Sequence, residues 1–141
     1  MPAGWSDWGK WVPVGRMELI IIPRYRAEGE LTISAGETRT FYYEKGIDNI
    51  YEFVPSLKTL SIFTASFSVN RNVLIYVEIL EEKEEDPGVY NVIARKYGYQ
   101  KVKFEFGEIR YFPSNTRPVY RVYNPNDVDL ELRWFVTGYI S

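Results

Sequence analysis

Apolar and polar residues alternate with a period of two along the C-terminal segment, from Arg117 to Ile140. This period is typical of a β-strand with one buried face, whereas a helix repeats about every 3.6 residues. The residues Asn124-Pro125-Asn126-Asp127 separate two such stretches, so the segment predicts an antiparallel hairpin. In its second strand, polar residues (Asp129, Glu131, Arg133) occupy one face and apolar residues the other: Val128, Leu130, Leu132, Trp134, Val136 and Ile140.

The same alternation recurs through most of the preceding chain. Together with the C-terminal segment it gives about eight to ten strands and no helix, which predicts an all-β fold: an antiparallel two-sheet β-sandwich of jelly-roll type. A further hairpin is expected around Lys96 to Gln100, and Asn70-Arg71-Asn72 is expected to turn the chain. The earlier strands are predicted at 17–22, 31–35, 38–44, 63–69, 73–80, 89–95, 102–106 and 109–112, and 50–54 is a further candidate.

The predicted core is formed by the apolar faces of these strands. The strand at 73–80 differs from the others because it is apolar on both faces, with Leu74 and Tyr76 opposite the core-facing residues. A central strand covered twice would explain this pattern, and so would a strand at a subunit interface. The residues expected in the core are Phe63, Phe67, Val77, Phe104, Leu130, Leu132 and Trp134.

Residues 1–16 form a different kind of sequence, in which Trp5, Trp8 and Trp11 stand among glycines and prolines. Glycine and proline oppose a helix, whereas a polyproline-like path has three residues per turn and would align the three indoles. We therefore predict a Trp-rich extended arm at 1–16 and a single sandwich domain at 17–141. The arm either packs on its own domain or docks on a neighbouring subunit, and the neighbour is the preferred interpretation.

Composition excludes several kinds of chemistry. The chain has no histidine and no cysteine, so Ser-His-Asp and Cys-His catalysis, zinc sites with such ligands and disulfides cannot be built. Its 19 acidic residues show no cleft motif for glycoside hydrolysis. The acidic segment 81–88 has no EF-hand order and is expected to be a solvated loop. We predict no enzyme activity, no metal and no cofactor.

The beginning and the hydropathy of the chain bear on its location. The first residues lack the charged segment and apolar run of a signal peptide, and no stretch has the length of a membrane span. With one Gln and two Met, the composition fits a thermophilic source.

Aromatic residues make up 17% of the chain and include 12 Tyr, which indicates contact surfaces. Tyr97 and Tyr99 lie close to Lys101 and Lys103, an arrangement that could stack bases and bind a single-stranded backbone. The net charge of −2 opposes this interpretation. The same tyrosines, with the tryptophans of the arm, could instead stack on sugar rings.

The chain resembles single jelly-roll proteins of virus particles in its overall order: an extended arm, about eight short strands and a long C-terminal strand. Within it, Leu31-Thr-Ile-Ser-Ala-Gly-Glu-Thr-Arg-Thr-Phe41 is similar to the strand–turn–strand openings of virion and tail sandwiches. The resemblance implies self-assembly. Virion arms that bind a genome are strongly basic, whereas this arm has only Lys10 and Arg16 against Asp7, which favours a spike, turret, fibre or minor coat role.

These observations predict a non-enzymatic, self-associating structural protein, a component of a virion or filament. Its expected partners are itself and other virion or filament proteins, through an interface that includes Trp5, Trp8, Trp11, Leu74 and Tyr76. The alternative is a carbohydrate-binding module that binds glycans, and a single-stranded nucleic-acid binder is a third interpretation. The residues of the alternative ligand site are Tyr97, Tyr99, Lys101 and Lys103.

Overall fold

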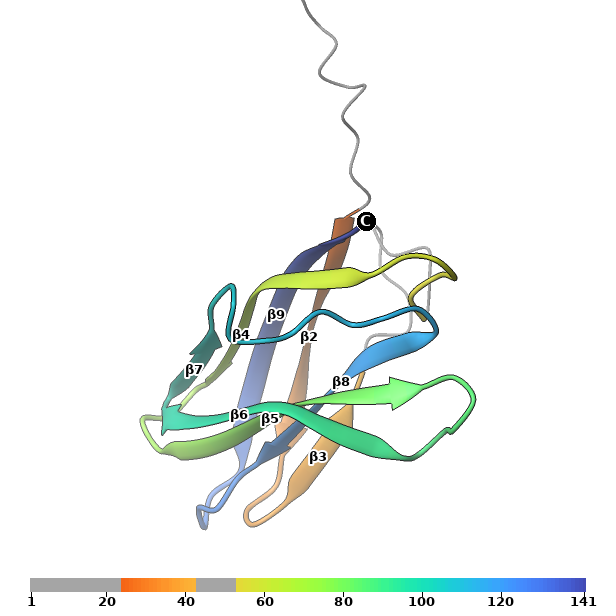
Figure 1. Cartoon of the computed structure of the whole chain (residues 1–141). Helices are drawn as coiled ribbons and strands as arrows, with labels where there is room; N and C mark the ends of the chain where they lie inside the picture. The colour runs from red at the N-terminus through yellow and green to blue at the C-terminus, as the bar shows by residue number, and fades with distance from the viewer. Residues whose placement is uncertain (1–23, 43–52) are drawn as a thin grey trace, which may run out of the picture.

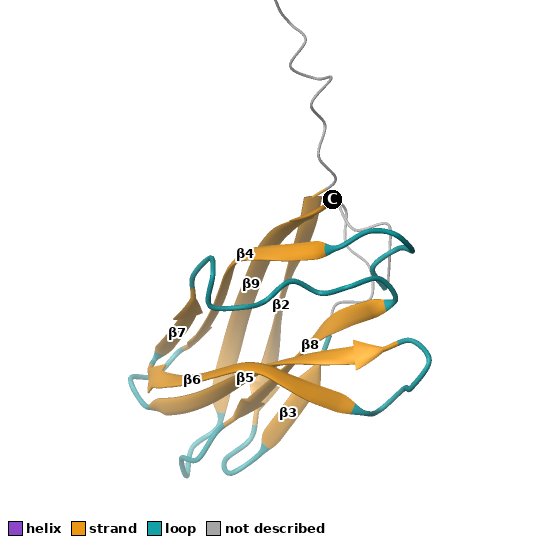
Figure 2. Ribbon diagram, in the orientation of Figure 1, coloured by secondary structure: helices purple, strands orange, loops and turns teal. Residues whose placement is uncertain are grey.

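The computed structural model describes residues 24–42 and 53–141, and in these ranges it contains strands and no helix (Figures 1 and 2). The arm, the strand predicted at 17–22 and most of the strand predicted at 50–54 lie outside the described residues. The described strands are β2 (Arg24–Ile33), β3 (Thr38–Phe41), β4 (Leu60–Val69), β5 (Leu74–Lys83), β6 (Tyr90–Tyr99), β7 (Lys101–Phe104), β8 (Thr116–Tyr123) and β9 (Leu130–Ile140).

The described strands form two antiparallel sheets that pack face to face (Figure 1). The first sheet has the order β2-β9-β4-β7 and the second has the order β3-β8-β5-β6. Among the described strands, β5 and β6 are joined as a hairpin within one sheet, and every other consecutive pair crosses from one sheet to the other. Eight strands in two such sheets form a jelly roll, which confirms the predicted fold class.

The two predicted hairpins are wrong, because each predicted pair of strands is divided between the two sheets. In the C-terminal pair, β8 pairs with β3 and β5, while β9 pairs with β2 and β4. The corner between them is held by buried Asn124, whose Nδ2 donates to the carbonyl oxygens of Ile33 (3.3 Å), Ser34 (3.1 Å) and Val128 (2.7 Å). A period of two reports which face of a strand is buried, but it does not report which strand lies alongside.

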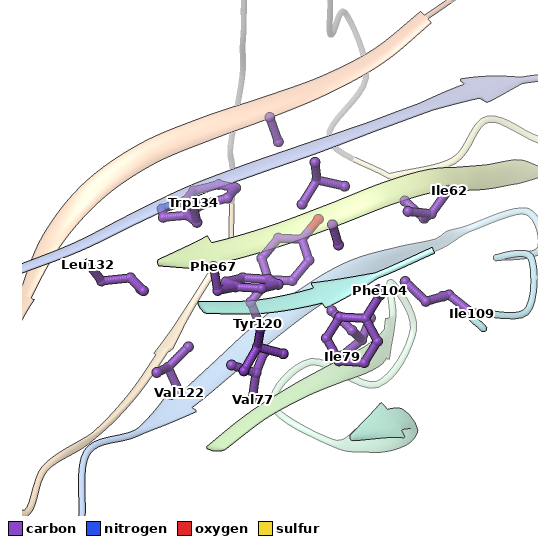
Figure 3. Close-up of a cluster of buried hydrophobic side chains, with 14 of the residues drawn as sticks. Ile62, Phe67, Val77, Ile79, Phe104, Ile109, Tyr120, Val122, Leu132 and Trp134 are labelled. Atoms are coloured by element: carbon purple, nitrogen blue, oxygen red, sulfur yellow. The ribbon is translucent and has the colours of Figure 1, made fainter. Parts of the chain in front are cut away.

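The core lies between the sheets and is centred on Tyr120 (Figure 3). The Tyr120 ring lies 5.7 Å from the ring of Phe67 and 5.3 Å from that of Trp134, centroid to centroid. Its hydroxyl is 3.1 Å from the Tyr25 hydroxyl, so the buried polar tip has a hydrogen-bond partner. The residues correctly predicted to be in the core are Phe67, Val77, Phe104, Leu130, Leu132 and Trp134, all of which are buried.

The prediction that Phe63 belongs to the core is wrong, because its side chain is 43% exposed. The pairing of β4 with β9 shifts register between Ile62 and Thr64, which is a β-bulge. The extra residue reverses the alternation, so Ile62 is buried and Phe63 points outward. On the outer surface the Phe63 ring lies 5.1 Å from the Tyr139 ring and 5.6 Å from the Phe106 ring.

Strand β5 is central in its sheet, between β8 and β6, as its two apolar faces indicate. Leu80 is fully buried on the face opposite Ile79. The strand continues into the predicted acidic loop, where Glu81 and Glu82 are buried rather than solvated. Each forms an ion pair: Arg110 Nη1 is 3.3 Å from a Glu81 carboxylate oxygen, and Arg117 Nε is 2.8 Å from a Glu82 carboxylate oxygen.

Candidate binding surface

A row of three tyrosines crosses the outer face of the second sheet. The strand register places Tyr123 of β8 beside Tyr76 of β5, and Tyr76 beside Tyr97 of β6. The ring centroids are 5.9 Å apart in the first pair and 5.7 Å apart in the second. Tyr76 is 41% exposed and Tyr97 is 68% exposed, so the tyrosine row presents aromatic surface to solvent.

A charged row runs parallel to the tyrosine row, and each of its residues lies two positions from a tyrosine on the same strand. Here Glu78 of β5 lies between Arg121 of β8 and Arg95 of β6. Arg121 Nε donates to Glu78 Oε1 at 2.7 Å, and Arg95 Nη2 lies 3.1 Å from Glu78 Oε2. Because two guanidinium groups share one carboxylate, the charged row carries one positive charge in excess.

The two rows line a hollow with a volume of about 570 Å³. Ligand sites of small molecules typically have volumes of about 300–1,000 Å³, so the hollow is large enough for one. The other residues that line it are Thr38, Val77 and Lys96.

Lys96 is held at the edge of the sandwich by an ion pair. Its Nζ donates to Glu108 Oε2 at 2.8 Å and to the carbonyl oxygen of Lys103 at 2.9 Å. The backbone N–H of Glu105 also donates to Glu108, and this bond, followed by the one from Lys96, lowers the pKa of the Glu108 carboxyl. Glu108 therefore stays ionised and balances the charge of Lys96.

Residues from both predicted sites meet at the hollow. Tyr76, from the predicted interface, contacts Tyr97, from the predicted ligand site. Leu74 pairs with Tyr99 at one end of the same two strands. The tryptophans of the predicted interface, Trp5, Trp8 and Trp11, lie outside the described residues.

The structure separates the lysines of the predicted ligand site from its tyrosines. Lys101 and Lys103 belong to β7 in the first sheet, where they pair with Ser68 and Ser66 of β4. Tyr97 and Tyr99 belong to β6 in the second sheet. The four residues of the predicted site are therefore divided between the two sheets.

Sequence reasoning missed Tyr123, Arg121 and Glu78 as members of this surface. Alternation alone places Tyr76 with Glu78 on one face of β5, and Arg121 with Tyr123 on one face of β8. The missing information was the register that sets the two strands beside each other, which depends on the sheet order.

Strand β6 is an edge strand among the described strands of the second sheet, where it pairs on one side with β5. It is ten residues long, and its outward side chains include Val92 (42% exposed), Tyr97 and Tyr99 (67% exposed). Long edge strands with apolar side chains are templates for pairing with another chain.

Residues 24–42 and 53–141 contain no group of three or more acidic residues, histidines or cysteines arranged to hold a metal ion. Over the same ranges no helix is long and apolar enough to cross a membrane.

No protein-family model and no curated protein sequence matches this chain. Among solved structures, the Yersinia pseudotuberculosis-derived mitogen aligns with a TM-score of 0.46 at 10% identity, over 80% of this chain and 85% of the mitogen. PirA aligns with a TM-score of 0.46 at 8% identity, over 81% of this chain and 93% of PirA. The decameric BFDV capsid protein aligns with a TM-score of 0.38 at 7% identity, over 83% of this chain and 95% of the capsid chain. All three alignments have TM-scores below 0.5, so they concern the arrangement of strands and carry no conclusion about family or role.

Proposed function

We propose that this protein is a structural, non-enzymatic β-sandwich that self-associates, as a component of a virion or a filament. The observation that carries the proposal is the edge strand β6, which is long and exposes apolar side chains. Pairing this edge with a second copy would satisfy its outward N–H and C=O groups and cover part of the tyrosine surface.

The other described sheet ends carry the features that usually prevent such pairing. Strands β3 and β7 are only four residues long. Strand β2 is ten residues long, but its outward side chains include the charged residues Arg26, Glu28 and Glu30. Short edges and outward charges both oppose edge-to-edge association. Strand β6 is thus the described edge that is best suited to a partner.

Strand β6 carries two charged residues, and each forms an ion pair within the domain. Arg95 is bound to Glu78, and Lys96 is bound to Glu108. An antiparallel contact between two β6 strands would be two-fold symmetric, the commonest symmetry of soluble oligomers. It would join two four-stranded sheets into one continuous sheet.

We propose the arm at 1–16, with Trp5, Trp8 and Trp11, as a second contact between copies. A fully extended arm of this length spans up to about 50 Å, at roughly 3.3 Å per residue, so it can reach a neighbour. Burial of three indoles would favour association, at about 25 cal/mol per Å² of apolar surface, before the entropy of ordering the arm is subtracted.

The test of the edge contact compares two valine substitutions. Val92→Lys places a charge on the outward face of β6, whereas Val89→Lys places the same charge at a more exposed position just before the strand. Sedimentation equilibrium should show dissociation of the Val92→Lys oligomer at a concentration at least about tenfold higher than the wild type, equivalent to about 1.4 kcal/mol. Val89→Lys should behave as the wild type. Equal behaviour of all three proteins would refute the β6 contact.

The hollow favours a second candidate function, that of a carbohydrate-binding module. A row of exposed aromatic rings beside hydrogen-bonding side chains is the kind of surface that stacks on a sugar ring. Retention of the intact protein on immobilised polysaccharide, lost on Tyr97→Ala, would support this function. Absence of retention on every polysaccharide would reject it.

A further inference from the structure

We infer that the hollow recognises an acidic saccharide, a sugar chain that bears carboxylate or sulfate groups. The inference rests on the carbohydrate-binding candidate function and adds the ligand class and the residue that selects it. The tyrosine row would stack on a sugar ring, and the charged row would bind the acidic group. The charge of the hollow and the spacing of its two rows both match such a ligand.

The charge of the hollow is opposite in sign to that of the whole chain, which is −2. Two cations of its lining, Arg95 and Arg121, lie on the outer face with Glu78. Glu78 balances one of them, so one positive charge remains. A neutral sugar would leave this charge without a partner, whereas an acidic group would neutralise it.

Arg95 is the residue placed to make this contact. Its side chain is 70% exposed, and the contact with Glu78 uses one terminal nitrogen. A guanidinium group has five N–H donors in a planar fork, so donors remain that match the two oxygens of a carboxylate or sulfate. Arg121 is less exposed, and its Nε is directed at Glu78. We therefore assign selectivity for the acidic group to Arg95.

The spacing of the two rows fits one sugar ring with its acidic substituent. Tyr97 and Arg95 both point outward from β6 and are separated by one residue. Two steps along a strand span about 6.8 Å. Tyr97 would thus lie under the ring while Arg95 meets a charged group at its edge. A small free anion would use Arg95 alone and would gain nothing from the tyrosines.

A polynucleotide has both stacking faces and negative charge, but it fits this surface less well. Binding to a nucleic-acid backbone depends on several cations along a track, each of which neutralises one phosphate. The hollow has one positive charge in excess. Lys101 and Lys103, which could extend a track, lie in the other sheet. A ligand with isolated acidic groups therefore suits the surface better.

The experiment measures the binding of three probes to the intact chain by isothermal titration calorimetry: galacturonic-acid tetrasaccharide, sulfated galactose tetrasaccharide and neutral galactose tetrasaccharide. At least one acidic probe should bind about tenfold more tightly than the neutral probe, and its affinity should fall as salt is added. Arg95→Gln should remove this preference. The control Arg133→Gln changes an arginine of similar exposure, 76%, on the outer face of the other sheet, and should have no effect.

A second pair of variants tests the stacking row. Tyr97→Ala should weaken binding of the acidic probe about tenfold or more. Tyr99→Ala is a matched control, because Tyr99 lies on the same strand and is almost equally exposed, but it does not line the hollow. Its affinity should equal that of the wild type.

The outcomes separate the inference from the function on which it rests. Equal binding of acidic and neutral probes, unaffected by Arg95→Gln, would overturn acid recognition and leave carbohydrate binding in place. No binding of any saccharide would overturn both. Tighter binding of an oligothymidylate of the same charge, lost on Tyr97→Ala, would overturn the inference in favour of nucleic acid.

Discussion

Replacing Phe67 and Phe63 separately by alanine tests the bulge that sets the interior of the first sheet. Both residues lie on β4, and simple alternation would place them on the same face. In the structure Phe67 is 0% exposed, whereas Phe63 is 43% exposed. The same chemical change is therefore made twice on one strand, once in the core and once on the outer surface.

The two substitutions should differ clearly in their effect on the free energy of unfolding. Phe67 contacts the rings of Phe104 (6.3 Å) and Tyr120 (5.7 Å), and its removal leaves a cavity between the sheets. Emptying such a site costs about 3–5 kcal/mol. Phe63 loses its contacts with two surface rings, each worth about 0.5–1.5 kcal/mol, and opens no interior cavity. We therefore expect Phe63→Ala to cost about 1–3 kcal/mol, the sum of the two ring contacts.

Urea unfolding followed by far-UV circular dichroism measures both values. The three proteins must be compared at one concentration, because self-association makes apparent stability depend on it. Equal m-values would show that the changes act on stability rather than on the unfolded state. Equal losses from the two substitutions, or a larger loss from Phe63→Ala, would contradict the bulge and the assignment of Phe63 to the surface.

Three further substitutions test the core by the same unfolding assay. Trp134→Ala should cost about 3–5 kcal/mol, because the indole packs on Phe41 and Tyr120, and a loss under about 1 kcal/mol would place Trp134 at the surface. Gly138→Ala should cost about 1–3 kcal/mol or more, because a Cβ there would overlap the backbone oxygen of Ser61 beside the bulge, and an unchanged midpoint would contradict this packing. Burial raises the pKa of the Tyr120 hydroxyl, which therefore stays protonated in the folded state while the unfolded chain loses its proton near pH 10. The free energy of unfolding should therefore fall above about pH 10. Its slope against pH should be steeper in the wild type than in Tyr120→Phe by about 1.4 kcal/mol per pH unit, and equal slopes in the two proteins would contradict this assignment.

The fold class could be predicted from the sequence because alternation reports burial directly. Leu130, Leu132 and Trp134 follow a strict period of two and are buried as predicted. The prediction for Phe63 was wrong because a bulge reverses the alternation, and a bulge depends on the partner strand. The predicted hairpins were wrong because the local alternation of apolar and polar residues is the same in both cases. It does not distinguish a strand that turns back into its own sheet from one that crosses to the other sheet.

The candidate surface could be predicted only in part, for a related reason. The sequence singles out both Tyr76 and Tyr97, but for two different sites. Their contact depends on the register between β5 and β6, and the charged row depends in addition on β8. Such neighbours are far apart in the sequence, so composition and periodicity do not bring them together.

The solution mass of the protein tests the proposal of self-association most directly. One chain has a mass of 16.6 kDa. Light scattering of the intact chain should give a multiple of this value, and residues 17–141 alone should give a smaller species with unchanged β-sheet content. An intact chain that stays at 16.6 kDa at every concentration would contradict self-association. If residues 17–141 also failed to fold, the tryptophans of the arm would belong to the core of their own domain.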